Sequence, residues 1–138
     1  MAIGGTVKGT IRTGLLVLLA VEDGDRTEDI EWLAGKTARM RIFPDEQGLM
    51  NRSVTQASGE VLVISQFTLF ASTRKGNRPS FSRAAQPETA ILLYEAFLKQ
   101  LGTELGKPVQ AGEFGADMKV QLVNDGPVTI IIDSRAKE

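Results

Sequence analysis

The apolar positions of this chain follow two periods, one typical of strands and one typical of helices. Residues 14–21 form a continuous apolar run, which predicts a strand buried on both faces, and residues 6–11 predict a strand before it. Apolar and small residues then recur at helical spacing, so we expect a helix over Thr27–Arg39. Asp25 followed by Glu28 resembles a capping box at the start of this helix.

A long alternating segment follows. Residues 41–43 predict a short strand before a turn at residues 45–48. Residues 60–70 predict a long strand, in which Leu62, Ile64, Gln66 and Thr68 share one face. Two polar side chains therefore continue an otherwise apolar face.

The last third predicts a second helix and two final strands. Pro87 suits the first position of that helix, and Gly102 and Gly106 are expected to end it. Residues 118–124 and 128–132 predict the closing strands. The fold class we expect is α+β, a single domain over residues 1–138 with barrel-like mixed β-sheets covered by two helices.

Composition narrows the possible functions. The chain has 138 residues, 42% of them apolar, which suits one domain with its own core. The longest apolar run is too short to cross a bilayer, and no secretion signal is recognisable, so we expect a cytoplasmic protein with no membrane partner. A formal charge of −1 is not typical of a protein that coats nucleic acid, and we expect no DNA partner.

Positive charge is concentrated in one loop. No acidic residue occurs between Val61 and Pro87, while Arg74, Lys75 and Arg78 fall inside this stretch. Such a loop is either simply solvated or holds phosphates by charge without reading bases. Any RNA contact is therefore expected to be local.

The chain contains no histidine and no cysteine. Histidine is the usual general base near neutral pH, and cysteine is the most readily activated nucleophile. An enzyme with this sequence must therefore use a carboxylate, a hydroxyl, backbone amides, an oxygen-ligated metal or the substrate itself. We expect no metal site and no cofactor.

Two polar segments interrupt apolar strands. Ser65, Gln66, Phe67 and Thr68 either mark a strand end emerging into solvent or place polar atoms against a ligand. Gly126-Pro127 is either an ordinary turn or a place where backbone carbonyls point away from the sheet.

Taken together, these segments resemble the D-aminoacyl-tRNA deacylase family. The matching stretches occur in the family's order from about Gly5 to Ser134, and they are residues 14–19, 39–43, 65–69, 73–76, 78–81, 114–118 and 124–129. Members of that family open with a further strand carrying a Gln-Arg-Val pattern before the position of Met1. We therefore expect one sheet to lack a strand, and the family's early arginine to be missing.

The resemblance implies a homodimer that binds the aminoacylated 3′ end of tRNA. Ser65, Gln66, Phe67 and Thr68 would form the floor of the pocket, with Phe114 and Met118 nearby. Gly126-Pro127 would reach into the partner's pocket, where its carbonyls hold the substrate's α-amino group. The basic loop would contact the tRNA.

The implied reaction is hydrolysis of the ester in D-aminoacyl-tRNA, and we expect it to extend to mischarged glycyl-tRNA. Without a base for Thr68, water attack assisted by the ribose hydroxyl is favoured over a covalent Thr68 intermediate. Two alternatives stay open. The protein could be a non-catalytic module that binds a tRNA end or a small ligand, or an editing domain that acts in trans on another tRNA error.

Overall fold

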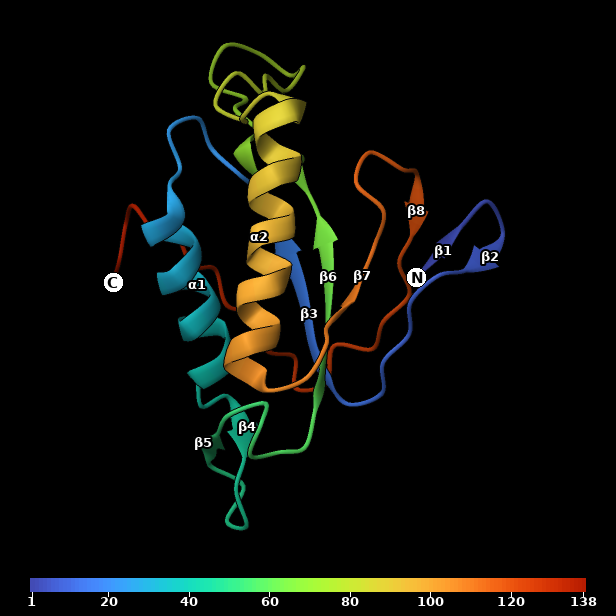
Figure 1. The fold of residues 1–138 in the computed structure, drawn as a ribbon, viewed down its shortest axis with the longest axis vertical. Helices are drawn as coiled ribbons and strands as arrows, with labels where there is room; N and C mark the ends of the chain where they lie inside the picture. The colour runs from blue at the N-terminus through green and yellow to red at the C-terminus, as the bar shows by residue number, and fades with distance from the viewer.

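A computed structural model describes residues 1–138, and its two helices stand in front of a small central sheet (Figure 1). The helices are α1 (Thr27–Arg39), α2 (Pro87–Leu105) and a 3₁₀ helix η1 (Phe67–Phe70). The strands are β1 (Ala2–Ile3), β2 (Thr6–Val7), β3 (Gly14–Leu19), β4 (Phe43–Pro44), β5 (Met50–Arg52), β6 (Glu60–Ser65), β7 (Gln110–Ala111) and β8 (Met118–Lys119).

The central sheet is parallel and has the order β3-β6-β7. Each connection between neighbouring strands contains a helix, α1 in the first and α2 in the second, as parallel pairing requires a long crossover. The sheets β2-β1-β8 and β4-β5 are antiparallel. The expected α+β class with two covering helices is therefore correct, but the sheets of this chain do not close into a barrel.

The core lies between the central sheet and the two helices. Val61 and Val63 of β6 face Phe97 and Leu101 of α2, and all four are almost completely buried. Small residues of α1, including Ala34, let the two helices approach each other closely. This packing fixes the end of β6, where the chain turns into η1.

The helix bounds agree closely with the sequence, but one cap differs. In α1 the N-cap residue is Arg26, and its amide donates to the carboxylate of Asp29 at 2.8 Å. Asp25, expected to cap the helix with Glu28, instead accepts a hydrogen bond from the amide of Glu22. Helix α2 continues through Gly102 and ends at Gly106, whose φ of 73° is the left-handed conformation that glycine adopts without strain.

Three strand predictions were too long. The strand expected over residues 6–11 is confined to β2, and the one expected over residues 60–70 ends at Ser65. Gln66 leaves the extended conformation with ψ at 73°, so the chain turns into η1. The strand expected over residues 14–21 ends at Leu19, and it is not covered on both faces, because Leu18 is 44% exposed.

The expected closing strands are almost absent. Only β8 forms, and residues 120–132 make no backbone–backbone hydrogen bond. Val123 and Ile131 are 91% and 92% exposed. The backbone groups of residues 120–132 therefore have no hydrogen-bonding partner on the backbone of this chain. Neither α1 nor α2 is both long and apolar enough to span a membrane.

Candidate functional site

The segment Ser65–Thr68 lies where β6 ends. Ser65 pairs with Leu19 of β3, and the amide of Gln66 donates to the Leu19 carbonyl at 2.7 Å. Immediately afterwards η1 begins, and the amide of Leu69 donates to the Gln66 carbonyl at 3.1 Å. The alternation of the sequence predicts that Gln66 and Thr68 share one face of a strand, and this prediction is wrong. The two residues instead meet across one turn of η1.

That turn joins the two polar side chains directly. The side-chain amide nitrogen of Gln66 donates a hydrogen bond to the hydroxyl oxygen of Thr68. Both Phe67 and Thr68 are exposed. The first amides of a helix precede its first internal hydrogen bond, so the N–H groups of Phe67 and Thr68 are not used by η1. Two backbone donors and an oriented hydroxyl therefore occur side by side at the surface.

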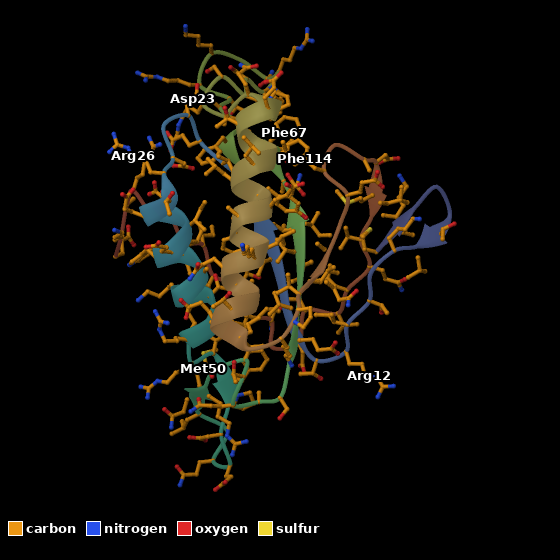
Figure 2. All side chains as sticks on the ribbon, in the orientation of Figure 1. Arg12, Asp23, Arg26, Met50, Phe67 and Phe114 are labelled. Atoms are coloured by element: carbon orange, nitrogen blue, oxygen red, sulfur yellow. The ribbon has the colours of Figure 1, made fainter.

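Phe67 also connects η1 to the basic loop. Its ring lies 5.1 Å from that of Phe81 in an edge-to-face arrangement, a favourable geometry for two aromatic rings. Figure 2 shows Phe67 at the same end of α2 as Phe114. The candidate pocket floor and the root of the basic loop are thus one packed unit.

Phe114 and Met118 are held next to the end of β6. The ring of Phe114 lies 6.0 Å from that of Tyr94, whose hydroxyl donates to the carbonyls of Val63 and Gly112 at 3.3 and 3.4 Å. Burial raises the pKa of Tyr94, so its hydroxyl remains a donor. The position of Phe114 therefore depends on a buried, hydrogen-bonded tyrosine.

Met118 depends on a glycine for its place. A Cβ atom added to Gly112 would lie 2.5 Å from the sulfur of Met118 and 3.1 Å from the Cδ1 of Ile64. Only glycine leaves room for the thioether at this end of β6. Met118 and Phe114 therefore lie close to the last residues of β6.

Gly126-Pro127 forms a cis peptide bond in an exposed turn. The side chain of Asn124 spans this turn, donating to the hydroxyl of Thr129 at 2.9 Å and accepting from the amide of Val128 at 3.0 Å. Gly126 has a φ of 134°, and an added Cβ would lie 2.8 Å from the side chain of Val128. The turn is thus fixed by its own side chains and requires glycine.

Within one chain this turn and residues 65–68 are not connected by any hydrogen bond. In Figure 1 the segment after β8 runs toward the end of the sheet where β3 and β6 begin, whereas η1 lies beyond the end where β6 finishes. The structure therefore does not bring together all the residues expected to form one site.

The basic loop is exposed throughout residues 71–80. Its ends are joined by Ser72 and Ser80, whose amides and carbonyls exchange two hydrogen bonds of 2.8 Å. Arg74, Lys75 and Arg78 form no ion pair with the protein. Their charges are therefore available to an external anion.

No sequence pattern predicts a role for Arg83, which the structure places at the junction of the loop and η1. Its guanidinium carbon lies 5.1 Å from the centre of the Phe70 ring, and one nitrogen lies 3.3 Å from the carboxylate of Glu22. Sequence spacing contains no signal for this contact, because Glu22 and Arg83 are far apart along the chain. No group of three or more acidic side chains is arranged to hold a metal ion.

The chain is similar to proteins of known family. A family model described as D-Tyr-tRNA(Tyr) deacylase matches residues 1–133. A D-aminoacyl-tRNA deacylase from Parabacteroides distasonis is 61% identical over 138 residues, which is all of this chain and 92% of that relative. A D-aminoacyl-tRNA deacylase from Akkermansia muciniphila is 61% identical over 136 residues, covering 99% of this chain and 91% of the relative.

Two solved structures have a similar fold. One, described as c-Myc DNA Unwinding Element Binding Protein, has a TM-score of 0.89 and 38% identity, and covers 98% of this chain and 91% of the other. The second, described as a probable eukaryotic D-amino acid tRNA deacylase, has a TM-score of 0.62 and 18% identity over 74% and 75% of the two chains. At 18% identity the second likeness concerns the fold alone.

Proposed function

Since the chain belongs to the D-Tyr-tRNA(Tyr) deacylase family, we propose that it hydrolyses the ester of D-aminoacyl-tRNA with a site built on Ser65–Thr68. The products are free tRNA and a D-amino acid, so the protein proofreads the chirality of charged tRNA in the cytoplasm. The single observation that carries the site assignment is the exposed Gln66–Thr68 pair, which lies directly before an acid-free basic loop.

The reaction needs stabilisation of an oxyanion on the attacked carbonyl. The unused amides of Phe67 and Thr68 are the donors proposed for this oxyanion, and preorganised donors of this kind contribute about 3–4 kcal/mol to such steps. They belong to backbone held by β6 and η1, so they cost little reorganisation. Residues 65–68 therefore contribute mainly electrostatic stabilisation.

The nucleophile in this proposal is water. The Thr68 hydroxyl accepts a hydrogen bond from Gln66 and has no base to remove its proton. The vicinal 2′-hydroxyl of the terminal ribose is the group that assists the water. Thr68 positions substrate groups and forms no covalent intermediate, and no cofactor takes part.

A second copy of the chain completes the site. In one chain Gly126-Pro127 is not hydrogen-bonded to residues 65–68, and residues 120–132 lack backbone partners. In a two-fold dimer, each chain places its Gly126-Pro127 turn in the pocket of the other chain, and residues 120–132 find backbone partners on that chain. The carbonyls of Gly126 and Pro127 then hold the substrate's α-amino group, with Phe114 and Met118 beside it.

Chiral selection follows from holding the amino group and the carbonyl at the same time. With these two groups fixed, the D-enantiomer directs its side chain to solvent, whereas the L-enantiomer directs its side chain into the wall of the pocket. Rejection is therefore steric, without a dedicated side-chain pocket. Glycine has no side chain to reject, so mischarged glycyl-tRNA is a second substrate.

Arg74, Lys75 and Arg78 contact the phosphates of the tRNA in this proposal. Their charges are unpaired and the loop is exposed, which suits binding by charge without base readout. The description of one solved relative refers to a DNA element, and free basic side chains attract any phosphate. Binding of nucleic acid without turnover is therefore the second candidate function.

Turnover separates these candidates. Purified protein is incubated with D-tyrosyl-tRNA, with L-tyrosyl-tRNA, and with each substrate in the presence of single-stranded DNA as a competitor. The proposal expects rapid release of D-tyrosine, little release of L-tyrosine and weak competition. Binding of tRNA or DNA without release of either amino acid would support the second candidate.

A further inference from the structure

A network of charged side chains lies outside the proposed site, between three segments that are distant in sequence. Glu22 and Asp25 belong to the loop between β3 and α1, and their side chains are only 17% and 15% exposed. Arg83 approaches from the end of the basic loop and Arg135 from the C-terminal segment. Two largely buried carboxylates therefore face two arginines.

Glu22 is the member shared by both arginines. Its Oε1 lies 3.3 Å from the Nη2 of Arg83, and its Oε2 lies 3.8 Å from the Nε of Arg135. Its own amide donates to Asp25 at 2.8 Å, which fixes the loop from which it projects. A carboxylate held in this way joins two segments that do not otherwise share an ion pair.

The backbone reinforces the Arg83 side of the network. Residue Glu22 pairs with Ala84 as an isolated antiparallel bridge, and the amide of Asp23 donates to the Arg83 carbonyl at 3.3 Å. The amide of Ala85 donates to the Val21 carbonyl at 2.9 Å. The returning end of the basic loop is therefore attached to the body of the protein at Glu22, while residues 71–80 extend into solvent.

Arg83 contacts both Glu22 and η1, the helix that contains Thr68 of the proposed pocket floor. Its guanidinium lies over the ring of Phe70, the last residue of η1, at 5.1 Å. Thr68 and the unused amides lie on the same short helix. A displacement of Arg83 would therefore act on both the phosphate-binding loop and η1.

Arg135 joins the segment that follows Gly126-Pro127 to the loop between β3 and α1. It donates to the carboxylate of Asp25 at 3.0 Å and to the carbonyl of Asp23 at 2.6 Å. Burial lowers the pKa of Arg135, but the charges of Asp25 and Glu22 outweigh burial and raise the pKa above its usual value. The guanidinium is thus a permanent positive charge that holds the C-terminal segment against the loop after β3.

We propose that Glu22 is a positioning residue for deacylation, which aligns the basic loop with η1 through Arg83 and with the C-terminal segment through Arg135. The inference rests on the proposed function, since it concerns how tRNA is placed on residues 65–68. Exposed ion pairs contribute little, but Glu22 is largely buried, serves two arginines and adjoins the loop's backbone attachment. Its charge therefore sets the geometry of the loop.

The first variant is Glu22→Gln, which keeps the shape and removes the charge. The matched control is Glu104→Gln, because Glu104 is 26% exposed and pairs with Arg39 at 3.0 Å on the opposite end of the helices. Glu22→Gln should raise the KM for D-tyrosyl-tRNA about tenfold with a smaller change in kcat, as expected for loss of one charge-assisted contact. Glu104→Gln should leave both constants unchanged.

The decisive measurement combines Glu22→Gln with replacement of Arg74, Lys75 and Arg78 by alanine. If Glu22 aligns the loop, its removal already misplaces those charges, so the combined change in KM is smaller than the product of the separate changes. Hydrogen exchange of residues 71–86 and 133–138 should also accelerate in Glu22→Gln but not in Glu104→Gln. A purely structural role would give multiplicative effects and a general loss of protection.

Arg135→Gln tests the same network from an exposed position, 39% accessible, and so covers the case in which Glu22→Gln does not fold. If the wild type releases D-tyrosine but Glu22→Gln and Arg135→Gln behave like Glu104→Gln in KM and in hydrogen exchange, the positioning role of Glu22 is wrong. The proposed function is then unaffected. Wild-type protein that releases no D-tyrosine would overturn the proposed function, and the positioning role with it.

Discussion

The side-chain amide nitrogen of Gln66 donates a hydrogen bond to the hydroxyl oxygen of Thr68. A nucleophilic hydroxyl needs a base that takes its proton, and the neutral carboxamide of Gln66 is not a base. The chain contains no histidine that could replace it. The geometry of this pair therefore favours Thr68 as a residue that orients other groups.

Thr68→Ala should keep substantial hydrolysis. Loss of one positioning hydrogen bond costs about 1–2 kcal/mol, which corresponds to a decrease in kcat of about five- to thirtyfold. Single-turnover kinetics with D-tyrosyl-tRNA measure this effect. The companion substrate carries a 2′-deoxy terminal ribose with the amino acid on the 3′ position, and it should hardly react. Normal cleavage of the deoxy substrate together with an inactive Thr68→Ala would identify Thr68 as the nucleophile.

Gly126→Ala should reduce both rate and chiral selection. Its φ of 134° is open only to glycine, and the added methyl would lie 2.8 Å from Val128. The control is Gly48→Ala on the β4–β5 hairpin, where φ is 78° and no atom lies within 4 Å. Gly48→Ala carries backbone strain of about 1–2 kcal/mol without a clash, but only Gly126→Ala should change the ratio of D- to L-tyrosyl-tRNA hydrolysis. An unchanged ratio would remove this turn from the site.

A site shared between two chains predicts complementation between two impaired variants. Gly126→Ala distorts the turn proposed to enter the partner's pocket, and Phe67→Pro lacks one proposed oxyanion amide. Mixed by unfolding and refolding, they form heterodimers in which one of the two sites has both native parts. About a quarter of wild-type activity should return. A mixture as inactive as its components, or full activity in a strict monomer, would argue against a shared site.

The basic loop should contribute affinity and not chemistry. Replacing Arg74, Lys75 and Arg78 with alanine should raise KM and lower the salt dependence by about one unit of slope per lost phosphate contact. The saturated rate should stay nearly constant. Arg12→Ala with Arg41→Ala is the control, since both arginines are exposed and distant from the loop in sequence. A kcat that falls as far as kcat/KM would assign the loop a catalytic role.

Acid should weaken the start of α1. The amide of Arg26 lowers the pKa of Asp29, with smaller contributions from Ser134, Arg135 and Lys137, against the opposing effect of burial. A lowered pKa means that the carboxylate stabilises the fold at neutral pH and that this contribution is lost as pH falls below about 4. The urea midpoint of Asp29→Asn should therefore decline less between pH 7 and pH 3 than that of the wild type. Asp117→Asn, in an exposed pair with Lys119, is the control.

The sequence was most informative where structure is local. The bounds of α1 follow from its apolar spacing, and the end of α2 follows from Gly106. The end of β6 does not, because Gln66 leaves the strand only after its amide has paired with Leu19 on a distant strand. The cap of α1 shifted by one residue for a similar reason, since Asp25 is engaged by Glu22 and Arg135.

The polar interruptions of the sequence predict candidate site residues, but they do not predict how these residues are arranged in space. Ser65–Thr68 and Gly126-Pro127 interrupt apolar segments of the sequence, and the family resemblance implies roles for both. Their separation within one chain, and the junction at Glu22, depend on contacts between distant segments that no local pattern records. The strands expected over residues 118–132 also require a ladder partner, so their propensity alone does not form them.

The lack of backbone hydrogen bonds over residues 120–132 also bears on how an isolated chain behaves in solution. This segment is rich in Val, Leu and Ile, and its only charged residue is Asp125. Exposed β-prone backbone with so little charge is a template for indiscriminate strand addition, the usual first step of aggregation. In newly made chains, correct pairing of these residues therefore competes with aggregation. Slow synthesis at low temperature should favour soluble protein, because it leaves fewer unassembled chains to collide at any moment.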